Sequence, residues 1–179
     1  LLRVLARQVE AQLELRRAAE IQGRRMAAAA AREQRLITAL TSAQVGWWDW
    51  DIATGTVFGS ADLARDRELD PATTRQGVPQ ETMMQSVHPG DRLWLREALG
   101  EAIETGAPFR EEYRLLTASG EVRWTSARGR CLRGPDGKPW RFPGVAIDIT
   151  DRKLTEERLR DSHIGRELAM QAAQLGRFD

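Results

Sequence analysis

Few side chains in this sequence could ligate a metal, accept a phosphoryl group or act as a nucleophile. The 179 residues include two histidines, His88 and His163, and a single cysteine, Cys131. A structural zinc site needs about four Cys or His ligands, and a Gly-rich phosphate loop needs the pattern G-x-x-x-x-G-K, which does not occur. No Ser/His/Asp order stands out either. The sequence therefore predicts no catalytic residue, no metal site and no enzyme in this fragment.

The elements that would position any site begin with a helix. Up to about residue 42 the chain contains no proline and one glycine, and it is rich in Ala, Leu, Arg, Gln and Glu, which favour helix. A three-four spacing along this segment is typical of a coiled-coil seam, formed by Leu2, Leu5, Val9, Gln12, Arg16, Ala19, Gly23, Met26, Ala30, Glu33, Ile37 and Leu40. We expect residues 1–35 to be a helical linker or coiled coil. For residues 33–42, an amphipathic helix packed on its own domain is an equal alternative.

The middle of the chain has the pattern of an α+β domain. Residues 45–52 and 56–59 predict a hairpin, and three further strands are predicted within 108–117, 120–132 and 141–150. The stretch "HPGDRLWLREALGEAIETG" between them predicts a helix that Asp91 caps and Gly106 ends. His88, beside Pro89 at the entrance of this helix, is interpreted as a capping residue and not as a haem ligand. This order of elements predicts an antiparallel sheet with helices on one face.

Residues 36–150 resemble a PAS domain of the subgroup with a HPDDR-like step and a DIT ending. The matching motifs are "GWWDWD", "HPGDR" from His88 to Arg92, "EYR" at 112–114, "VRW" at 122–124 and "GVAIDITDRK" at 144–153. The resemblance implies a five-stranded antiparallel sheet in the order 2-1-5-4-3, flanked by long N- and C-terminal helices. It also implies a pocket between sheet and helices, and a place in a multidomain bacterial sensor protein.

The end of the chain repeats part of its middle. "AQLGRFD" at 173–179 matches "AQVGWWD" at 43–49 in four of seven positions. We therefore interpret residues 151–175 as an exit signalling helix and residues 176–179 as the start of a second PAS repeat. The N-terminal helix resembles the closing helix of a GAF domain, and a plain coiled-coil linker is the alternative.

The resemblance and the apolar side chains together suggest a ligand pocket, formed by Trp48, Met83, Met84, Tyr113, Trp124, Val145 and Ile147. The alternative is that Trp48, Trp50 and Trp124 simply fill the core. Flavin photosensor domains of this fold carry a reactive cysteine in a "NCRFLQ" helix, which is absent here, whereas Cys131 is predicted to lie on a strand. No cofactor is the first expectation. A noncovalent flavin or a small organic ligand stays open, and haem is not expected because the long helix contains no histidine.

Signal transmission is predicted at the end of the last strand, through Asp148, Ile149, Thr150, Asp151 and Arg152. Short polar side chains here can satisfy free amides at a helix start and join sheet to helix stiffly. On the sheet, Glu112 and Arg114 could pair with Arg123 or its neighbours. His163 and the residue before it match only the first two residues of the "SHELR" phosphoacceptor pattern, so we interpret His163 as a solvated helix residue.

These features predict a PAS sensory and signal-relay module of a bacterial signalling protein, either a sensor histidine kinase of a two-component system or a cyclic-dinucleotide enzyme such as a diguanylate cyclase. We expect a homodimer through the flanking helices, with adjacent PAS, GAF and output domains as partners. The alternative is a ligand-free structural dimerisation and spacer module. A net charge of +1 and interleaved arginines and acids disfavour nucleic-acid binding. With no apolar stretch long enough to cross a bilayer, we expect a cytoplasmic location without membrane insertion.

Overall fold

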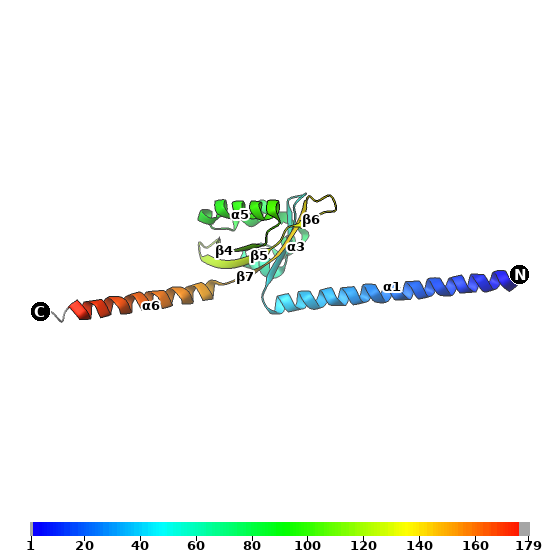
Figure 1. The fold of residues 1–179 in the computed structure, drawn as a ribbon, viewed down its shortest axis with the longest axis horizontal. Coiled ribbons are helices and arrows are strands. Elements are labelled where there is room, and N and C mark those ends of the chain that lie inside the picture. The colour runs from blue at the N-terminus through cyan, green and yellow to red at the C-terminus, as the bar shows by residue number, and fades with distance from the viewer. Residues whose placement is uncertain (1, 176–179) are drawn as a thin grey trace. The chain divides into compact units, whose positions relative to one another are not determined.

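A computed structural model describes the backbone of residues 2–175, and the side chains within that range except those of 2–11, 13–15, 18 and 165–175. The chain divides into two compact units, Leu1–Ala43 and Gln44–Asp179. The predicted start of a second PAS repeat, residues 176–179, lies outside the described residues. Figure 1 shows the elements of both units.

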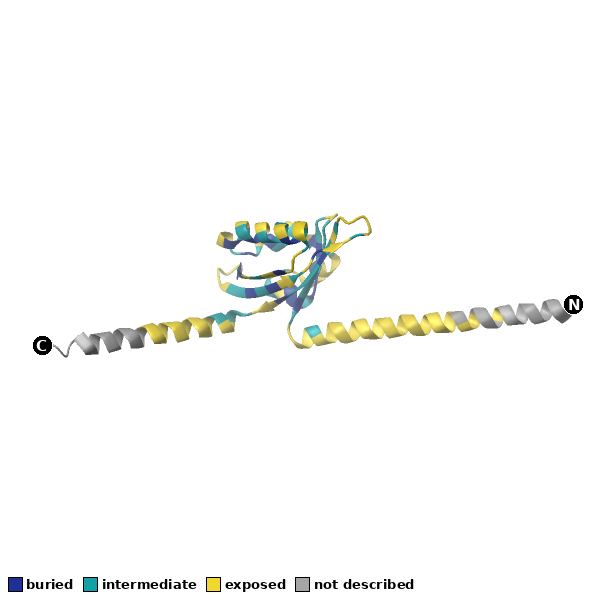
Figure 2. Cartoon of the chain, in the orientation of Figure 1, coloured by how far each residue is buried: buried dark blue, intermediate teal, exposed yellow. Residues whose placement is uncertain are grey.

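The first unit is a single helix, α1, which runs from Leu2 to Ser42 without a break. Its described side chains between residues 19 and 39 are all exposed, and Figure 2 shows this stretch in yellow. They include large apolar side chains, since Ile21, Met26 and Leu36 are 53%, 67% and 62% exposed. With about 3.6 residues per turn, these three positions lie on more than one face of the helix. Within this chain, the described part of α1 buries none of these three side chains.

The second unit contains one antiparallel sheet. Its five longer strands are β1 (Gly46–Asp51), β2 (Thr56–Gly59), β4 (Phe109–Leu116), β5 (Val122–Gly129) and β7 (Pro139–Asp148). Two two-residue strands that the sequence did not predict, β3 (Val78–Pro79) and β6 (Leu132–Arg133), pair with β2 and β7. The spatial order is β3-β2-β1-β7-β5-β4. The five longer strands thus have the predicted order 2-1-5-4-3, and the predicted α+β fold is confirmed.

Helices cover one face of this sheet (Figure 1). Three short helices follow β2, namely α2 (Ala61–Asp66), α3 (Pro71–Gln76) and α4 (Gln80–Gln85). Ser60 begins α2 by accepting a hydrogen bond from the Leu63 amide. After a short 3-10 turn, η1 (Pro89–Asp91), the longer α5 runs from Arg92 to Thr105. It ends at Gly106, whose φ of 74° is a conformation that glycine adopts without strain. The last helix, α6, spans Thr150–Leu175.

Asp91 does not cap α5 as predicted. Its carboxylate is buried and binds Arg114 of β4, with Oδ2 accepting from the Arg114 amide at 2.9 Å and from Nε at 3.0 Å, and Oδ1 accepting from Nη2 at 2.6 Å. The hydrogen bond from the Arg114 side chain holds the pKa of Asp91 at about 2, against an ordinary value of 3.8. His88 does have the predicted structural role, because its Nδ1 accepts from the Gly90 amide and starts the 3-10 turn.

The hydrophobic core lies between the sheet and the helices. Its buried members are Met84, Val87, Leu95, Ala102, Phe109, Tyr113, Leu115, Ala127, Cys131 and Phe142. Phe142 of β7 is fully buried, with ring centroids 6.2 Å from Trp50 and 6.0 Å from Phe109. Cys131 lies in the connection between β5 and β6 and not on a strand as predicted, because β5 ends at Gly129. The cysteine is therefore a small apolar core residue.

Candidate functional site

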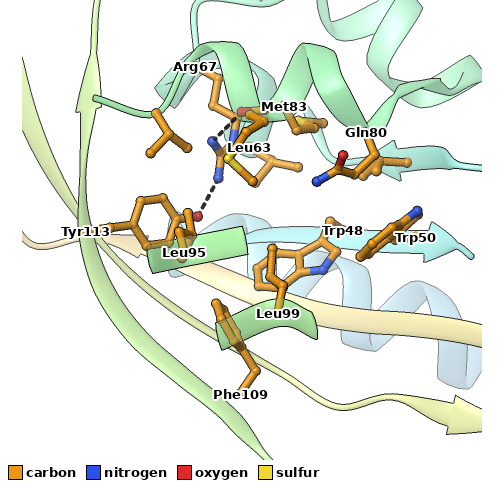
Figure 3. A pocket seen from close by; sticks show the side chains of 13 residues that line it. Trp48, Trp50, Leu63, Arg67, Gln80, Met83, Leu95, Leu99, Phe109 and Tyr113 are labelled. Carbon is orange, nitrogen blue, oxygen red and sulfur yellow. Dashed lines mark hydrogen bonds between the residues drawn. The ribbon is translucent and has the colours of Figure 1, made fainter. Parts of the chain in front are cut away.

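A small cavity lies within the core, bounded by β1, β2 and β4 on the sheet side and by α2, α4 and α5 on the helix side (Figure 3). Its volume is about 70 Å³. The lining is almost entirely apolar and aromatic, formed by Trp48, Trp50, Val57, Leu63, Arg67, Gln80, Met83, Met84, Val87, Leu95, Leu99, Phe109 and Tyr113. A mostly apolar wall with a few polar groups is the usual form of a small-molecule site.

Four of the seven predicted pocket residues line this cavity, namely Trp48, Met83, Met84 and Tyr113. The prediction was wrong for Trp124, Val145 and Ile147, which lie on the other face of the sheet. Successive side chains of a strand point to opposite faces. Thr125, beside Trp124, and Ala146, between Val145 and Ile147, are buried, so these three neighbours point outward, and Ile147 is 44% exposed.

Sequence reasoning missed Arg67 and Gln80, the two polar side chains of the lining besides Tyr113. Both come from the irregular stretch between β2 and the HPGDR step, where no periodicity indicates which side chains point inward. Leu95 and Leu99 carried a usable signal, because they lie four residues apart on the apolar side of the predicted helix. Combining that helix face with the first strand would have placed them opposite Trp48.

Arg67 is the cationic side chain of the cavity wall. It leaves the C-terminal end of α2 and crosses to β4, where Nη2 donates to the Tyr113 hydroxyl at 2.7 Å (Figure 3). Nη1 donates to Ser86 Oγ at 2.8 Å and to the Met83 carbonyl at 3.4 Å. Its Nε is buried and has no hydrogen-bond partner among the described residues. The guanidinium therefore joins α2, α4 and β4 at one edge of the cavity.

The cavity does not fit a flavin. A volume of about 70 Å³ is far below the several hundred Å³ typical of cofactor sites, and a flavin carries three fused rings. Cys131 does not line the cavity, so its thiol is not placed to form a bond to a ligand bound there. His88 does not line it either, and its Nδ1 already accepts a hydrogen bond. The residues present thus suit a ligand much smaller than flavin or haem.

The second feature of interest is the joint between the sheet and α6. The Trp124 amide of β5 donates to Thr150 Oγ1 at 2.9 Å, and the Ile149 amide donates to the Trp124 carbonyl at 2.9 Å. Asp148 Oδ1 accepts from the Thr150 amide at 2.8 Å and so satisfies one free amide at the start of α6. Asp151 is exposed, and its carbonyl accepts from Thr155. Three of the five predicted relay residues therefore form hydrogen bonds at the joint itself.

Arg152, another predicted relay residue, binds the outer face of the sheet. Its Nη2 lies 2.7 Å from Glu112 Oε1, and Lys153 Nζ lies 2.8 Å from the other carboxylate oxygen of Glu112. The Lys153 ammonium, assisted by Arg152, lowers the pKa of Glu112 below its ordinary value. Lys153 also lies over Trp124, 4.8 Å from the ring centroid. Glu112 thus binds the first turn of α6 through two cations.

The predicted ion pairs within the sheet were wrong. Glu112 binds Arg152 and Lys153, and Arg114 binds Asp91, whereas Arg123 lies 3.7 Å from Glu121. The reason is that α6 and the 3-10 turn present charged groups directly to β4. Sequence distance gave no indication of these partners, which are 40 and 23 residues away from Glu112 and Arg114.

Acidic side chains gather beside the same joint. Asp62 and Asp66 of α2, with Asp148 and Asp151, are among the residues that line a pocket there. Burial, and secondly the charge of Asp148, raise the pKa of Asp66 above its ordinary value. Across the described residues, no group of three or more His, Cys, Asp or Glu side chains has the arrangement of a metal site. Nor does any helix, as far as the structure describes it, contain a stretch apolar enough to cross a membrane.

Comparisons with known proteins agree with this geometry. The family described as the PAS fold matches residues 73–146. The chain is 35% identical over 114 residues to a blue-light-activated histidine kinase of Brucella anthropi, a match that covers 64% of this chain and 22% of the relative. A blue-light-activated histidine kinase of Brucella ovis is 28% identical over 165 residues, which cover 90% of this chain and 32% of that protein. The chain thus spans less than a third of the length of these relatives.

A solved structure extends the comparison to the whole domain. The crystal structure of a sensory box histidine kinase/response regulator from Burkholderia thailandensis has 32% sequence identity and a TM-score of 0.63. The match covers 74% of this chain and 98% of that chain. Strand order, the cavity between sheet and helices, the family match and this relative all agree, and the chain therefore belongs to the PAS domain family.

Proposed function

We propose that this PAS domain is a sensory and relay module of a longer bacterial signalling protein, and that the output of that protein is a histidine kinase. The kinases among its relatives support this assignment, at 35% and 32% identity. A diguanylate cyclase sensor domain from Marinobacter aquaeolei shares only 17% identity and so supports the fold alone. The kinase is therefore the preferred output over a cyclic-dinucleotide enzyme.

The observation that carries this proposal is the position of two neighbouring residues on β4. Tyr113 lies on the cavity face and binds Arg67, while Glu112 lies on the outer face and binds Arg152 and Lys153 of α6. A strand that shifts or twists moves both side chains together because they share one backbone. Rearrangement at the cavity therefore changes the position of the Glu112 carboxylate, and with it the first turn of α6.

Such a module works only if the ligand binds one of two conformations of the domain more tightly than the other. A ligand that binds both conformations equally does not change their populations. A ligand that binds Arg67 better in one position of β4 than in another would satisfy this condition, because Arg67 is joined to β4 through Tyr113. The joint of β5, β7 and α6 would carry the difference outward as a rotation or tilt of α6.

The second candidate is a ligand-free spacer that only dimerises and separates other domains. The small volume of the cavity, about 70 Å³, favours this reading, because the core side chains nearly fill the space. The two candidate functions differ in whether a conformational change at the cavity alters the position of α6. A test must therefore read the output of α6 and not only binding.

The relay predicts that kinase output depends on the rotational phase of α6. We suggest joining the chain in helical frame to a histidine kinase catalytic region and inserting one to seven residues after Arg160. Two inserted residues rotate the downstream helix by about 200° and are expected to change autophosphorylation severalfold, whereas seven restore the phase and the activity. The E112Q variant is expected to reduce the response to phase, and E157Q, an exposed glutamate of α6, is the matched control. Output that is indifferent to phase and to Glu112 would support the spacer.

We further propose that the module forms a homodimer through its flanking helices, and that α1 contributes the exposed apolar residues of its described seam. Met26 and Ile37 are 67% and 37% exposed and occupy seam positions, where two copies can bury them against each other. M26E combined with I37E is expected to weaken dimerisation at least tenfold, measured by light scattering across a concentration series. A28E, on the opposite side of the same helix, is the control. A wild-type chain that is monomeric at high concentration contradicts the proposal.

We infer that the neighbouring domains of the longer protein are a GAF domain, whose closing helix is the first part of α1, and a second PAS domain after α6, and that the module acts in the cytoplasm. The repeat of "AQVGWWD" as "AQLGRFD" supports the second PAS domain. The single cysteine, which is buried, is compatible with a reducing compartment.

A further inference from the structure

We propose that the cavity binds a short apolar monocarboxylate, and that the guanidinium of Arg67 recognises the carboxylate group. This inference rests on the proposed sensory function of the cavity and adds the chemical class of the ligand. It follows from the charge, the free donors, the apolar wall and the size of the cavity.

The first observation is a positive charge without an acidic partner. Arg67 forms no ion pair with a carboxylate among the described residues, although eight such pairs occur elsewhere in them. Its three hydrogen-bond acceptors, Tyr113 Oη, Ser86 Oγ and the Met83 carbonyl, are all neutral. A charge held in a partly buried, apolar environment is stabilised by a counter-ion. An anionic ligand would supply it.

The second observation is that donors remain free on this guanidinium. Arginine has about five N–H donors, and three hydrogen bonds are formed. The buried Nε has no partner among the described residues, and a further N–H remains on Nη2. The free N–H of Nη2 can donate to one carboxylate oxygen, whereas Nε, which protein atoms cover, reaches the second oxygen only when neighbouring side chains move aside. Lysine could not reproduce this contact, because its ammonium has no planar fork.

The third observation is the character and size of the remaining wall. The rest of the wall is mainly apolar, with Trp48, Leu95, Leu99 and Phe109 among its side chains (Figure 3). Its other polar groups besides Tyr113 are the Gln80 amide and the buried Nε1 of Trp50, which has no hydrogen-bond partner among the described residues. A volume of about 70 Å³ leaves room for roughly five or six water-sized atoms. Butanoate has about six non-hydrogen atoms, with a charged head and an apolar tail. Acids of this length therefore suit the site, whereas dicarboxylates would place a second charge where the lining has no second cationic side chain.

The test is a titration of the 179-residue chain with butanoate and pentanoate, followed by calorimetry and amide NMR shifts. We expect saturable binding, with shifts in α2 and β4, and at least tenfold weaker binding of butanamide and butylamine. R67Q is expected to weaken butanoate binding at least tenfold, and R67K to bind with intermediate affinity. R65Q is the matched control, because Arg65 lies on the same helix with a 65% exposed side chain that pairs with Asp62. Thermal unfolding of each variant checks that it folds.

The outcomes separate this inference from the proposed function. Equal affinity for butanamide and butanoate, or undiminished binding by R67Q, overturns recognition by Arg67. Failure of both acids to bind overturns the ligand class. In either case the phase dependence of the kinase fusion is unaffected, because that experiment uses no ligand. If R67Q does not fold, two comparisons still test recognition of the carboxylate by Arg67: the affinity of R67K against that of wild type, and the affinity for butanoate against that for butanamide.

Discussion

Replacement of Phe142 by alanine is expected to destabilise the domain by about 3–5 kcal/mol, the usual cost of removing a fully buried phenylalanine ring. The ring lies at the centre of the core, between Trp50 of β1 and Phe109 of β4. It also packs against Gly129 of β5, where an added Cβ would lie only 2.7 Å from a ring carbon. Because three strands meet at this side chain, its loss leaves a cavity that they cannot close without shifting.

Urea unfolding followed by tryptophan fluorescence measures this effect. F142L keeps most of the volume and is expected to cost less than half as much. W140A is the matched control, since Trp140 is an aromatic residue of the same strand that is 51% exposed, and its removal is expected to cost less than about 1 kcal/mol. A loss of less than about 1 kcal/mol in F142A would contradict the packing described here.

The second large effect is expected at Asp91. D91A removes three hydrogen bonds to Arg114, one of them from a backbone amide, and leaves that arginine without its counter-ion. Hydrogen bonds of this kind contribute about 1 kcal/mol each, and the 35% exposure of the Arg114 side chain reduces the total through solvent screening. We expect D91A to lower the free energy of unfolding by about 2 kcal/mol, measured as above. A urea midpoint of D91A equal to that of wild type would contradict this prediction.

The same pair predicts a pH dependence of stability. The pKa of Asp91 is about 2 when folded, below the ordinary value of 3.8 that applies to the unfolded chain. The ionised carboxylate therefore stabilises the fold above pH 3.8, and this contribution is lost as the pH falls from 3.8 toward 2. D91N, which cannot ionise, is expected to show a weaker fall of the urea midpoint over that interval than wild type. Parallel curves for the two proteins would exclude Asp91 as the titrating group.

The Asp91–Arg114 pair also lies next to the contacts of the cavity and of α6. Arg114 follows Tyr113 and Glu112 on β4, so the 3-10 turn, the cavity and the first turn of α6 all contact three consecutive residues of one strand. β4 is the last strand in the path of strands, with β5 on one side. On its other side, its backbone is hydrogen-bonded to residues 86–88 and forms a bridge between Leu115 and Val87. In the proposed function, β4 is the element that couples the cavity to α6.

Local chemistry was sufficient to predict most of the elements. The alternation of strand residues, the turn at 53–55 and the helix before Gly106 follow from preferences that act within a few residues. Gly106 ends α5 because its φ of 74° is accessible to glycine without strain. The order 2-1-5-4-3 came from the motifs at 46–51, 88–92 and 144–153, whose resemblance to PAS domains the relatives support.

Local chemistry did not determine which face of the last strand points inward. Val145 and Ile147 are as apolar as a core requires, yet the smaller Ala146 is buried, because the helices lie on its side of the sheet. Nothing in the pattern of β7 distinguishes the two faces. Which face of β7 is buried depends on the helices that pack against one side of the sheet.

The sequence by itself therefore determined the PAS fold, the strand order, the long helices and four of the residues that line the cavity. Only the tertiary structure decided that Arg67 enters the cavity, that Asp91 binds Arg114, and that Glu112 binds Arg152 and Lys153. The physical reason is that secondary structure depends on neighbours along the chain, whereas ion pairs and cavity walls depend on which elements meet in space. The contacts on which the proposed function depends join residues that are between 23 and 46 positions apart in the sequence.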